Sequence, residues 1–406
     1  MRATPASRCP RTFATRCSGR RRRPDGRERP LMGRHRGTGL AAIEYPTGMN
    51  QAGDPSQVWI KLKPDGRADV FTGTCDVGQG SRTVHAQIAA DTIGVPYEWV
   101  TLDNSNTDSS PLCTGTFASR GTFVGGNAIA RAAVETRNSL FDVAGEIMEV
   151  DPADLVSADG FVWPQGAPGA RRSISEIALE ATWQRGRMIS GQATYMKPFS
   201  APDPDTGECE PHYAISYGVC VAEVQVDDET GEVEVLQMTQ VYDVGRAINP
   251  ALVSGQIHGG AMMGLGLALL EESFPEYPGT GHRGAEFGSY LMPAPTELPA
   301  MHDSVLENPS AEGPFGAKAI GEMASNAQPP AIVNAIHDAV GVWITELPAK
   351  PERVLRALRE RAQPRREGKR VIFDEAQSIA AVSSLHGAGW PLVGPPATTP
   401  GGEGSE

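Results

Sequence analysis

The segment Gly313–Pro330, GPFGAKAIGEMASNAQPP, carries one lysine and one glutamate among glycines, and a helix is predicted to follow it. Glycine has no Cβ atom, so Gly321 lets the backbone beside Glu322 turn tightly or approach a ligand closely. In a buried, ligand-lined pocket such a carboxylate can act as a general base. Taken alone, the segment favours a simpler interpretation, in which Glu322 caps the next helix or forms a salt bridge with it.

Two other turns rich in small residues open onto predicted helices. The first is Gly78-Gln79-Gly80, before a helix with Ser81 as its expected N-cap. The second is Thr116–Thr122, before a long helical pattern over Gly125–Val150. The backbone N–H groups of the first turn, with its glutamine amide, are expected to be free to hold an acceptor-rich ligand. A simple need for glycine explains either turn equally, and Arg120 is assigned either to a phosphate or to a surface acid.

A third candidate element is the predicted helix Ala251–Glu272, which contains Gln256, His258 and several glycines. A glycine inside a helix costs about 1 kcal/mol relative to alanine. Such clustering therefore predicts close packing against another backbone or a bulky ligand. The simpler interpretation makes Gln256 a surface amide, and we expect His258 to be a satisfied core or surface histidine.

Hairpins and helices are predicted to position these residues. Alternating apolar and polar residues predict two β-hairpins, Gln57–Leu62 with Ala68–Thr72, and Val219–Val226 with Glu232–Val241. The further predicted elements are a strand at Trp99–Leu102, a helix at Ala331–Val340 and a short helix after Pro351. Residues 151–212, interrupted by Pro and Gly, are expected to be less regular.

Composition excludes several classes of protein. The 406 residues are 40% hydrophobic and 21% charged, as in a globular chain, and the net charge of −13 disfavours a nucleic-acid surface. The six cysteines form no CxxC pair, which predicts no zinc or iron–sulfur site and favours a reducing compartment, the cytoplasm. No apolar run approaches the about 20 residues of a membrane span, so no membrane contact is expected. There is no P-loop and no strand–GxGxxG–helix unit for a nucleotide or flavin.

The two ends differ in composition from the rest. Residues 1–33 are basic, with a run at Arg20–Arg23, and are predicted to be a disordered extension or the product of an early start codon, with Met32 as the alternative start. A transit peptide or a basic arm is the other interpretation. Residues 363–406 are charged and then rich in Gly, Pro and Thr, and are predicted to be a disordered tail.

Five stretches, taken in order over about residues 34–360, resemble the molybdopterin-binding subunit of the molybdenum hydroxylases, the xanthine dehydrogenase and aldehyde oxidase family. They are TCDVGQGSRTVHAQIAADTIGVP, TGTFASRGTFVGGNAIARAA, VDDETGEVEV, YDVGRAINPALVSGQIHGGAMMGLGLALLEE and GPFGAKAIGEMASNAQPPAIVNAIHDAVGV. Each stretch alone is weak evidence, whereas five in family order are specific.

The resemblance implies a mixed α/β fold, the carboxy-terminal half of the family's molybdopterin-binding region. This domain would span 34–362, with two similar subdomains of hairpins and glycine-rich helices at about 50–200 and 201–362. It implies that Glu322 is the general base and that no side chain ligates the metal directly. The implied cofactor-binding residues are Gly78, Gln79, Gly80, Thr116, Ala118, Ser119, Gly121, Gln256 and Gly321.

The implied activity is hydroxylation of an N-heterocycle or aldehyde carbon, with water as the oxygen source and a molybdopterin cofactor carrying molybdenum, the cytosine dinucleotide form being one alternative. The family's amino-terminal molybdenum half has no counterpart in this sequence. A companion chain is therefore expected to supply it, with a 2Fe-2S subunit and an FAD subunit as further partners and periplasmic export with a partner as the alternative to the cytoplasm. Residues Met323–Asn326 differ from the purine-oxidising branch, so xanthine is not the expected substrate.

A second hypothesis is a truncated or non-catalytic scaffold or assembly protein that never receives the cofactor. The missing half and the basic start favour it. A neighbouring reading frame that encodes the missing half would favour the enzyme instead.

Overall fold

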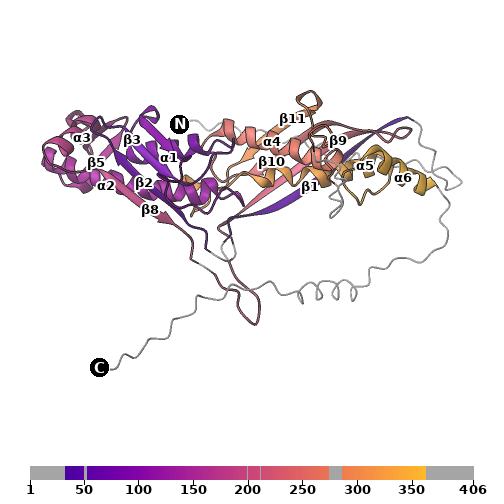
Figure 1. The fold of residues 1–406 in the computed structure, drawn as a ribbon, viewed down its shortest axis with the longest axis horizontal. Helices are drawn as coiled ribbons and strands as arrows, with labels where there is room; N and C mark the ends of the chain where they lie inside the picture. The colour runs from indigo at the N-terminus through magenta and orange to yellow at the C-terminus, as the bar shows by residue number, and fades with distance from the viewer. Residues whose placement is uncertain (1–32, 50–52, 199, 211, 274–285, 363–406) are drawn as a thin grey trace, which may run out of the picture. The chain divides into compact units, whose positions relative to one another are not determined.

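The computed structural model describes residues 33–49, 53–198, 200–210, 212–273 and 286–362 (Figure 1). The chain divides into two units after Glu360, and the fold described below is that of the first. This unit contains two four-stranded sheets, a three-stranded sheet and the helices that pack on them, which confirms the predicted mixed α/β class. The predicted disorder of residues 1–33 and 363–406 lies, Gly33 excepted, outside the described residues.

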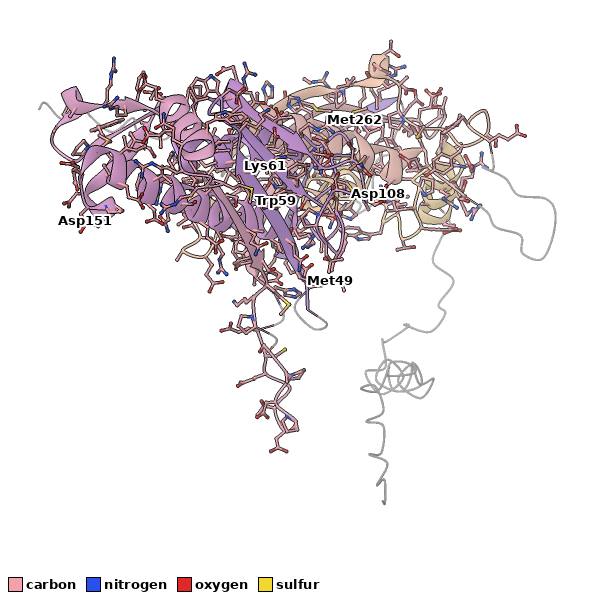
Figure 2. The ribbon with its side chains drawn as sticks, turned by 60° about the vertical axis from the view of Figure 1, so that its left-hand side comes forward. Met49, Trp59, Lys61, Asp108, Asp151 and Met262 are labelled. Carbon is pink, nitrogen blue, oxygen red and sulfur yellow. The ribbon has the colours of Figure 1, made fainter. Side chains whose placement is uncertain are left out.

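The first sheet contains the predicted amino-terminal hairpin. Its order is β4-β3-β2-β8, with strands Val100–Asp103 (β4), Ala68–Thr72 (β3), Ser56–Leu62 (β2) and Ser190–Tyr195 (β8). β2 pairs antiparallel with β3 and β8, and β3 pairs parallel with β4. Ile60 faces the buried core shared with helix α2 (Gly126–Met148). Away from that core, Trp59 stacks on Phe71 with ring centroids 5.1 Å apart, and Lys61 lies over both rings (Figure 2).

The second sheet contains the other predicted hairpin. Its order is β1-β9-β10-β11, with strands Arg34–Thr47 (β1), Ala214–Asp227 (β9), Val233–Asp243 (β10) and Ala300–Leu306 (β11). No strand was predicted at β1 or β11, because the strands that they pair with, β9 and β10, lie far away along the chain. Helix α5 (Gln328–Val340) packs against β1 and β9 (Figure 1). A Cβ atom added at Gly39 would lie 2.1 Å from the carbonyl oxygen of Ala331, so glycine allows this close approach.

Helices α1 (Ser81–Ile93) and α4 (Pro250–Leu269) begin where predicted, and α1 ends at Gly94 in the left-handed conformation that favours glycine. The N-cap of α1 was predicted wrongly. Gly80 occupies that position with φ 84°, and no side chain caps the helix. The Ser81 hydroxyl instead donates a hydrogen bond to the carbonyl oxygen of Cys75. The first turn of α1 is therefore tied to the loop that precedes it.

The region 151–212 is more regular than predicted. It contains strands Leu155–Ala158 (β5), Phe161–Pro164 (β6) and Arg172–Ser173 (β7) and helix α3 (Ile174–Trp183). Elsewhere, the short helix predicted after Pro351 is α6 (Pro351–Ala362). Ser173 and Glu176 form a reciprocal capping box at the start of α3. The S-x-x-E spacing that announces such a helix is present in the sequence, so this helix had a local signal.

Helix α4 corrects the expectation that no apolar run would reach the length of a membrane span. The helix has 20 residues, and an 18-residue window of it has a mean hydropathy of 1.2, which suffices by length and composition alone; 44% of that window is buried inside this structure. A Cβ atom at Gly260 would lie 2.5 Å from the Cβ atom of Ala324, and one at Gly264 would lie 2.8 Å from that of Gln328. The predicted close packing of this glycine-rich helix is therefore confirmed on one face, and core burial accounts for its apolar composition.

Candidate functional site

A cavity of about 440 Å³ lies where the turns before α1 and α2, helix α4 and the segment 313–330 meet. This volume is within the range of ligand pockets in proteins. The predicted site residues in its wall are Gln79, Thr116, Ser119, Gly121, Gln256, Gly321 and Glu322. Gly78, Gly80 and Ala118 are not in the wall but belong to the turns that form it. The fold thus brings residues from four separate stretches of sequence to one place.

The Gly78-Gln79-Gly80 turn is organised by Asp76. Its carboxylate accepts hydrogen bonds from the N–H groups of Gly78 at 2.9 Å, Gly80 at 3.3 Å and Arg82 at 2.9 Å. Burial alone would raise the pKa of the Asp76 carboxyl, but these hydrogen bonds outweigh burial and lower it. The expectation that these N–H groups are free is therefore wrong for this structure, because a nearby carboxylate already occupies them.

The Gln79 amide is also engaged within its own loop. Its oxygen accepts from the N–H of Val77 at 2.6 Å, and its nitrogen donates to the carbonyl oxygen of Cys75 at 2.8 Å. Thr116, from the second turn, donates to the same Cys75 oxygen at 3.0 Å. The two turns are thus joined through one carbonyl group, which fixes their relative position at the cavity.

The second turn adopts a strained backbone. Ala118 and Ser119 have φ values of 45° and 52°, in the left-handed region that residues with a Cβ atom rarely occupy. Such strain costs about 1–3 kcal/mol per residue and clusters at functional sites. A residue outside the turn stabilises it: the N–H of Gly48, just after β1, donates a hydrogen bond of 2.8 Å to the Ala118 carbonyl oxygen.

Arg120 supports this turn from inside the protein. Its side chain is fully buried and lies 2.5 Å from the carboxylate of Asp54, which is also buried. Its guanidinium also donates hydrogen bonds to the carbonyl oxygens of Gly115 at 2.6 Å and Pro55 at 3.1 Å, and the contact of its Nε with Asp54 is an ion pair. Of the two partners predicted for Arg120, a phosphate or a surface acid, the structure shows an acid, although this acid is buried.

Glu322 is connected directly to the second turn. The Ser119 hydroxyl donates a short hydrogen bond to its carboxylate, and the Glu322 N–H donates to the Ser119 oxygen at 3.2 Å. A Cβ atom at Gly321 would lie 2.7 Å from that oxygen, so glycine permits this contact. Helix α5 begins at Gln328 after Ala327, without a side-chain cap. The simpler interpretation of Glu322 as a helix cap is therefore wrong.

The glutamate loop is fixed to the end of β10. Lys318 is buried and pairs with Asp243 at 2.6 Å, and its N–H donates to the carbonyl oxygen of Val244 at 2.9 Å. A Cβ atom at Gly245 would lie 2.3 Å from the carbonyl oxygen of Gly316. Glu322 itself is exposed on this chain, so the buried pocket expected around it is not closed by the described residues alone.

Gln256 and Gly259 lie on the α4 side of the cavity wall, and Gly255 lies one residue before Gln256. Within the described residues, the Gln256 side chain makes no hydrogen bond, so its amide is available to a ligand. No atom lies within 4 Å of a Cβ position at Gly255 or Gly259. His258 lies 2.9 Å from a carboxylate oxygen of Asp303 and is half-exposed, which confirms a satisfied surface histidine.

His85 was missed by the sequence analysis, although it lies one helical turn into α1. It is fully buried, and its Nε2 lies 3.0 Å from the carbonyl oxygen of Gly121 in the π-helical turn Gly121–Gly125. Its Nδ1 has no partner within the described residues. Burial, partly opposed by the hydrogen bond, lowers the pKa of His85 to about 4. The neutral imidazole of His85 thus contacts the second turn from the interior of the protein.

We expect the buried, neutral His85 to make the free energy of unfolding decrease as the pH is lowered. Between about pH 6.5 and pH 4, His85 binds a proton in the unfolded chain but stays neutral in the folded chain, so protonation favours unfolding. The free energy of unfolding lost through His85 over this pH range is about 3 kcal/mol. Urea unfolding of wild type and His85→Gln at several pH values measures it. The wild type should lose stability more steeply between pH 6.5 and 4, whereas equal slopes would contradict the buried neutral ring. His302→Gln, which removes an exposed imidazole, is the control.

The cavity suits a flat, polar cofactor better than a bare metal ion. The Gln256 amide and the open surface at Gly259 of α4 can accommodate a planar ring with polar edges. The hydroxyls of Thr116 and Ser119, which already bond to Cys75 and Glu322, line the same cavity. In the part of the chain that the structure describes, no three His, Cys, Asp or Glu side chains gather as a metal site. The residues present therefore fit an organic cofactor that brings its own metal ligands.

A sequence profile of the molybdopterin cofactor-binding domain matches residues 14–299, more than half of the chain. The chain belongs to this family. The matched residues of this molybdopterin-binding chain include both cavity turns and Gln256, whereas Glu322 lies beyond them. The resemblance to the molybdenum hydroxylases described from the sequence is confirmed.

Named relatives of the family support this. The nicotine 6-hydroxylase large subunit of Paenarthrobacter nicotinovorans is 32% identical over 320 residues, which cover 77% of this chain and 38% of that protein. The probable hypoxanthine oxidase of Escherichia coli K12 is 32% identical over 80% of this chain and 32% of its own length. The solved structure of quinoline 2-oxidoreductase from Pseudomonas putida 86 has 29% identity and a TM-score of 0.71, over 81% of this chain and 42% of that one. The chain thus spans well under half the length of these relatives.

Proposed function

We propose that this chain is the molybdenum-cofactor-binding part of an oxidoreductase that hydroxylates an N-heterocycle or aldehyde carbon with water as the oxygen source. The observation that carries the proposal is the contact between Glu322 and Ser119 at the cavity. It unites the predicted base with the predicted cofactor turn. Relatives named for nicotine and quinoline, and an aldehyde oxidoreductase among the similar structures, support this substrate range.

In this proposal the cavity residues hold the cofactor and Glu322 moves a proton. Gln256 donates from α4, and Thr116 and Ser119 offer hydroxyls from the strained turn. Gly78 and Gly80 exchange their hydrogen bonds with Asp76 for contacts to the cofactor, and Gln79 exchanges those of its amide with Val77 and Cys75. Ala118, Gly121 and Gly321 leave the cofactor room. When bound, the molybdenum cofactor supplies two-electron redox chemistry. The Glu322 carboxylate accepts a proton from the water-derived oxygen that becomes the new hydroxyl group.

A companion polypeptide completes the site in this proposal. Glu322 is exposed on this chain, and Val77 and Met263 in the cavity wall are 77% and 66% exposed. Apolar side chains at the rim of a polar site favour contact with another protein surface. We further propose that separate 2Fe-2S and FAD subunits receive the electrons and that the complex is cytoplasmic.

Co-expression with a companion chain tests the proposal. The complex should contain about one molybdenum and one pterin per copy of this chain, measured by elemental analysis and pterin fluorescence, and it should oxidise an N-heterocycle or aldehyde with a dye as acceptor. The chain expressed alone should be free of cofactor. A lone chain with stoichiometric molybdenum would contradict the companion, and a complex without molybdenum would contradict cofactor binding.

The second candidate is a non-catalytic scaffold or assembly protein. The hydrogen bonds from Gly78, Gly80 and Arg82 to Asp76 favour it, because a turn whose donors are already satisfied needs no ligand to be stable. Elemental analysis separates the two candidates, since a scaffold would form the complex without retaining molybdenum.

A further inference from the structure

Three cationic side chains lie in the cavity wall among the described residues, and buried acids neutralise two of them. Arg120 pairs with Asp54 and Lys318 pairs with Asp243, and all four side chains are buried. The third is Arg246, which is exposed. In the part of the chain that the structure describes, its guanidinium group forms no ion pair and no hydrogen bond. The hydrogen-bonding capacity of this group is therefore open to a ligand in the cavity.

The neighbouring acids are engaged elsewhere. Glu307 lies beside the next residue, and its carboxylate accepts a hydrogen bond of 2.9 Å from the N–H of Ala247. Glu322, in the same cavity wall as Arg246, accepts the hydrogen bond from the Ser119 hydroxyl. Neither acid forms an ion pair with Arg246 within the described residues. The positive charge of Arg246 is therefore available to an anion that the described residues do not supply.

Arg246 belongs to a segment that is joined to the glutamate loop. The N–H of Arg246 donates to the carbonyl oxygen of Gly316 at 3.0 Å, and the N–H of Lys318 donates to the carbonyl oxygen of Val244 at 2.9 Å. Glu322 follows on the same loop and lies in the same cavity wall. Two adjacent segments thus bring the free guanidinium group and the proposed base to one cavity.

We propose that Arg246 binds an oxyanion in this cavity and that the oxyanion is a carboxylate group of the substrate. A guanidinium group donates two parallel hydrogen bonds to a carboxylate or a phosphate, and this planar match makes arginine suited to both. Apolar side chains lie in the wall on the same two segments, at Val244, Ile248 and Ile320. They suit the ring of an aromatic acid, so the site fits a ring that carries a carboxylate.

The place of Arg246 in the cavity favours the substrate over a phosphate of the cofactor. Gln256, Thr116 and Ser119, which the proposed function assigns to the cofactor, lie on α4 and on the second turn. Arg246 lies instead beside the loop of Glu322, the group that acts on the substrate. The assignment to a substrate carboxylate rests on the proposed function, whereas oxyanion binding by Arg246 does not.

Oxyanion binding can be tested on the full chain without turnover. Benzoate and inorganic phosphate are titrated at constant ionic strength, and affinity is measured from the rise in unfolding temperature. Wild type should bind benzoate about tenfold more tightly than Arg246→Gln, the effect of one hydrogen bond to a charged group. Equal affinities, or no binding of either anion by wild type, would overturn the proposal. Arg67→Gln, at an exposed arginine outside the cavity wall, is the control and should match wild type.

The source of the oxyanion is tested by the kinetics of the molybdenum-loaded complex. The substrates are two acids and their primary amides, pyridine-4-carboxylate with its amide and 4-formylbenzoate with its amide. In Arg246→Gln, kcat/KM for an oxidised acid should fall by about tenfold, while that for its amide and the molybdenum content stay unchanged. A variant that loses molybdenum and slows acid and amide alike would show that Arg246 binds a cofactor phosphate, which overturns the assignment to the substrate.

The two failures can be told apart. If the molybdenum-loaded wild-type complex oxidises none of the four compounds, the proposed function fails for this substrate range, and the assignment to a substrate carboxylate fails with it. If the complex oxidises acid and amide and Arg246→Gln changes neither rate, the proposed function stands and the assignment fails. In both cases the benzoate titration of the full chain still decides whether Arg246 binds an oxyanion.

Discussion

Replacing Glu322 with glutamine should lower turnover of the molybdenum-loaded complex by about 100-fold to 10,000-fold, the usual effect of removing a general base. Glutamine has nearly the same shape and still accepts the hydrogen bond from the Ser119 hydroxyl, so the loop should keep its fold. It cannot accept a proton at neutral pH. Molybdenum and pterin content should therefore stay at the wild-type level while kcat falls, measured as dye reduction per molybdenum.

Glu312→Gln is the matched control for this prediction. Glu312 lies ten residues before Glu322 in the sequence. It is exposed and is not in the cavity wall. Its contact with Lys197 at 3.4 Å is a long ion pair at the surface, in which Glu312 is 54% exposed, and it contributes at most about 1 kcal/mol to stability. This variant should keep wild-type turnover. Retained turnover in Glu322→Gln would rule out the base role, whatever the control does.

Replacing Arg120 with methionine should destabilise the chain by about 3–5 kcal/mol, because the buried Asp54 carboxylate keeps the Thr114 hydroxyl as a hydrogen-bond donor but loses its opposite charge. It also removes the donors to the carbonyl oxygens of Gly115 and Pro55, so the strained turn loses its inner support. Urea unfolding measures the stability, and molybdenum analysis of the co-expressed complex should show a matching loss of cofactor.

Two variants separate the buried pair from a general effect of charge removal. Arg187→Met breaks a half-exposed pair with Glu146 at 2.6 Å and should lower stability far less than Arg120→Met does. The double variant Arg120→Met with Asp54→Asn should recover part of the lost stability, since a neutral amide is easier to bury than a lone charge. A single Arg120→Met variant as stable as wild type would show that Asp54 does not depend on this arginine.

The sequence alone determined the local elements and the family. Both hairpins, helices α1, α2, α4 and α5 and the glycine stop at Gly94 follow from residue patterns within one segment, because periodicity and turn chemistry act over a few residues. Helix α3 had such a signal in its S-x-x-E capping box and could have been predicted. The ordered motifs also carried the resemblance that the family profile confirms.

Only the tertiary structure decided which groups meet. Ser119 and Glu322 are 203 residues apart, and neither segment by itself indicates that a serine hydroxyl would contact the carboxylate. The same holds for β1, which pairs with β9 and leads to Gly48, the donor to the Ala118 carbonyl oxygen. It also holds for Asp76, which occupies donors that the glycine turn was expected to leave free. Such contacts depend on the packing of whole sheets and helices, whose free energy is summed over many residues and is not encoded in any short stretch.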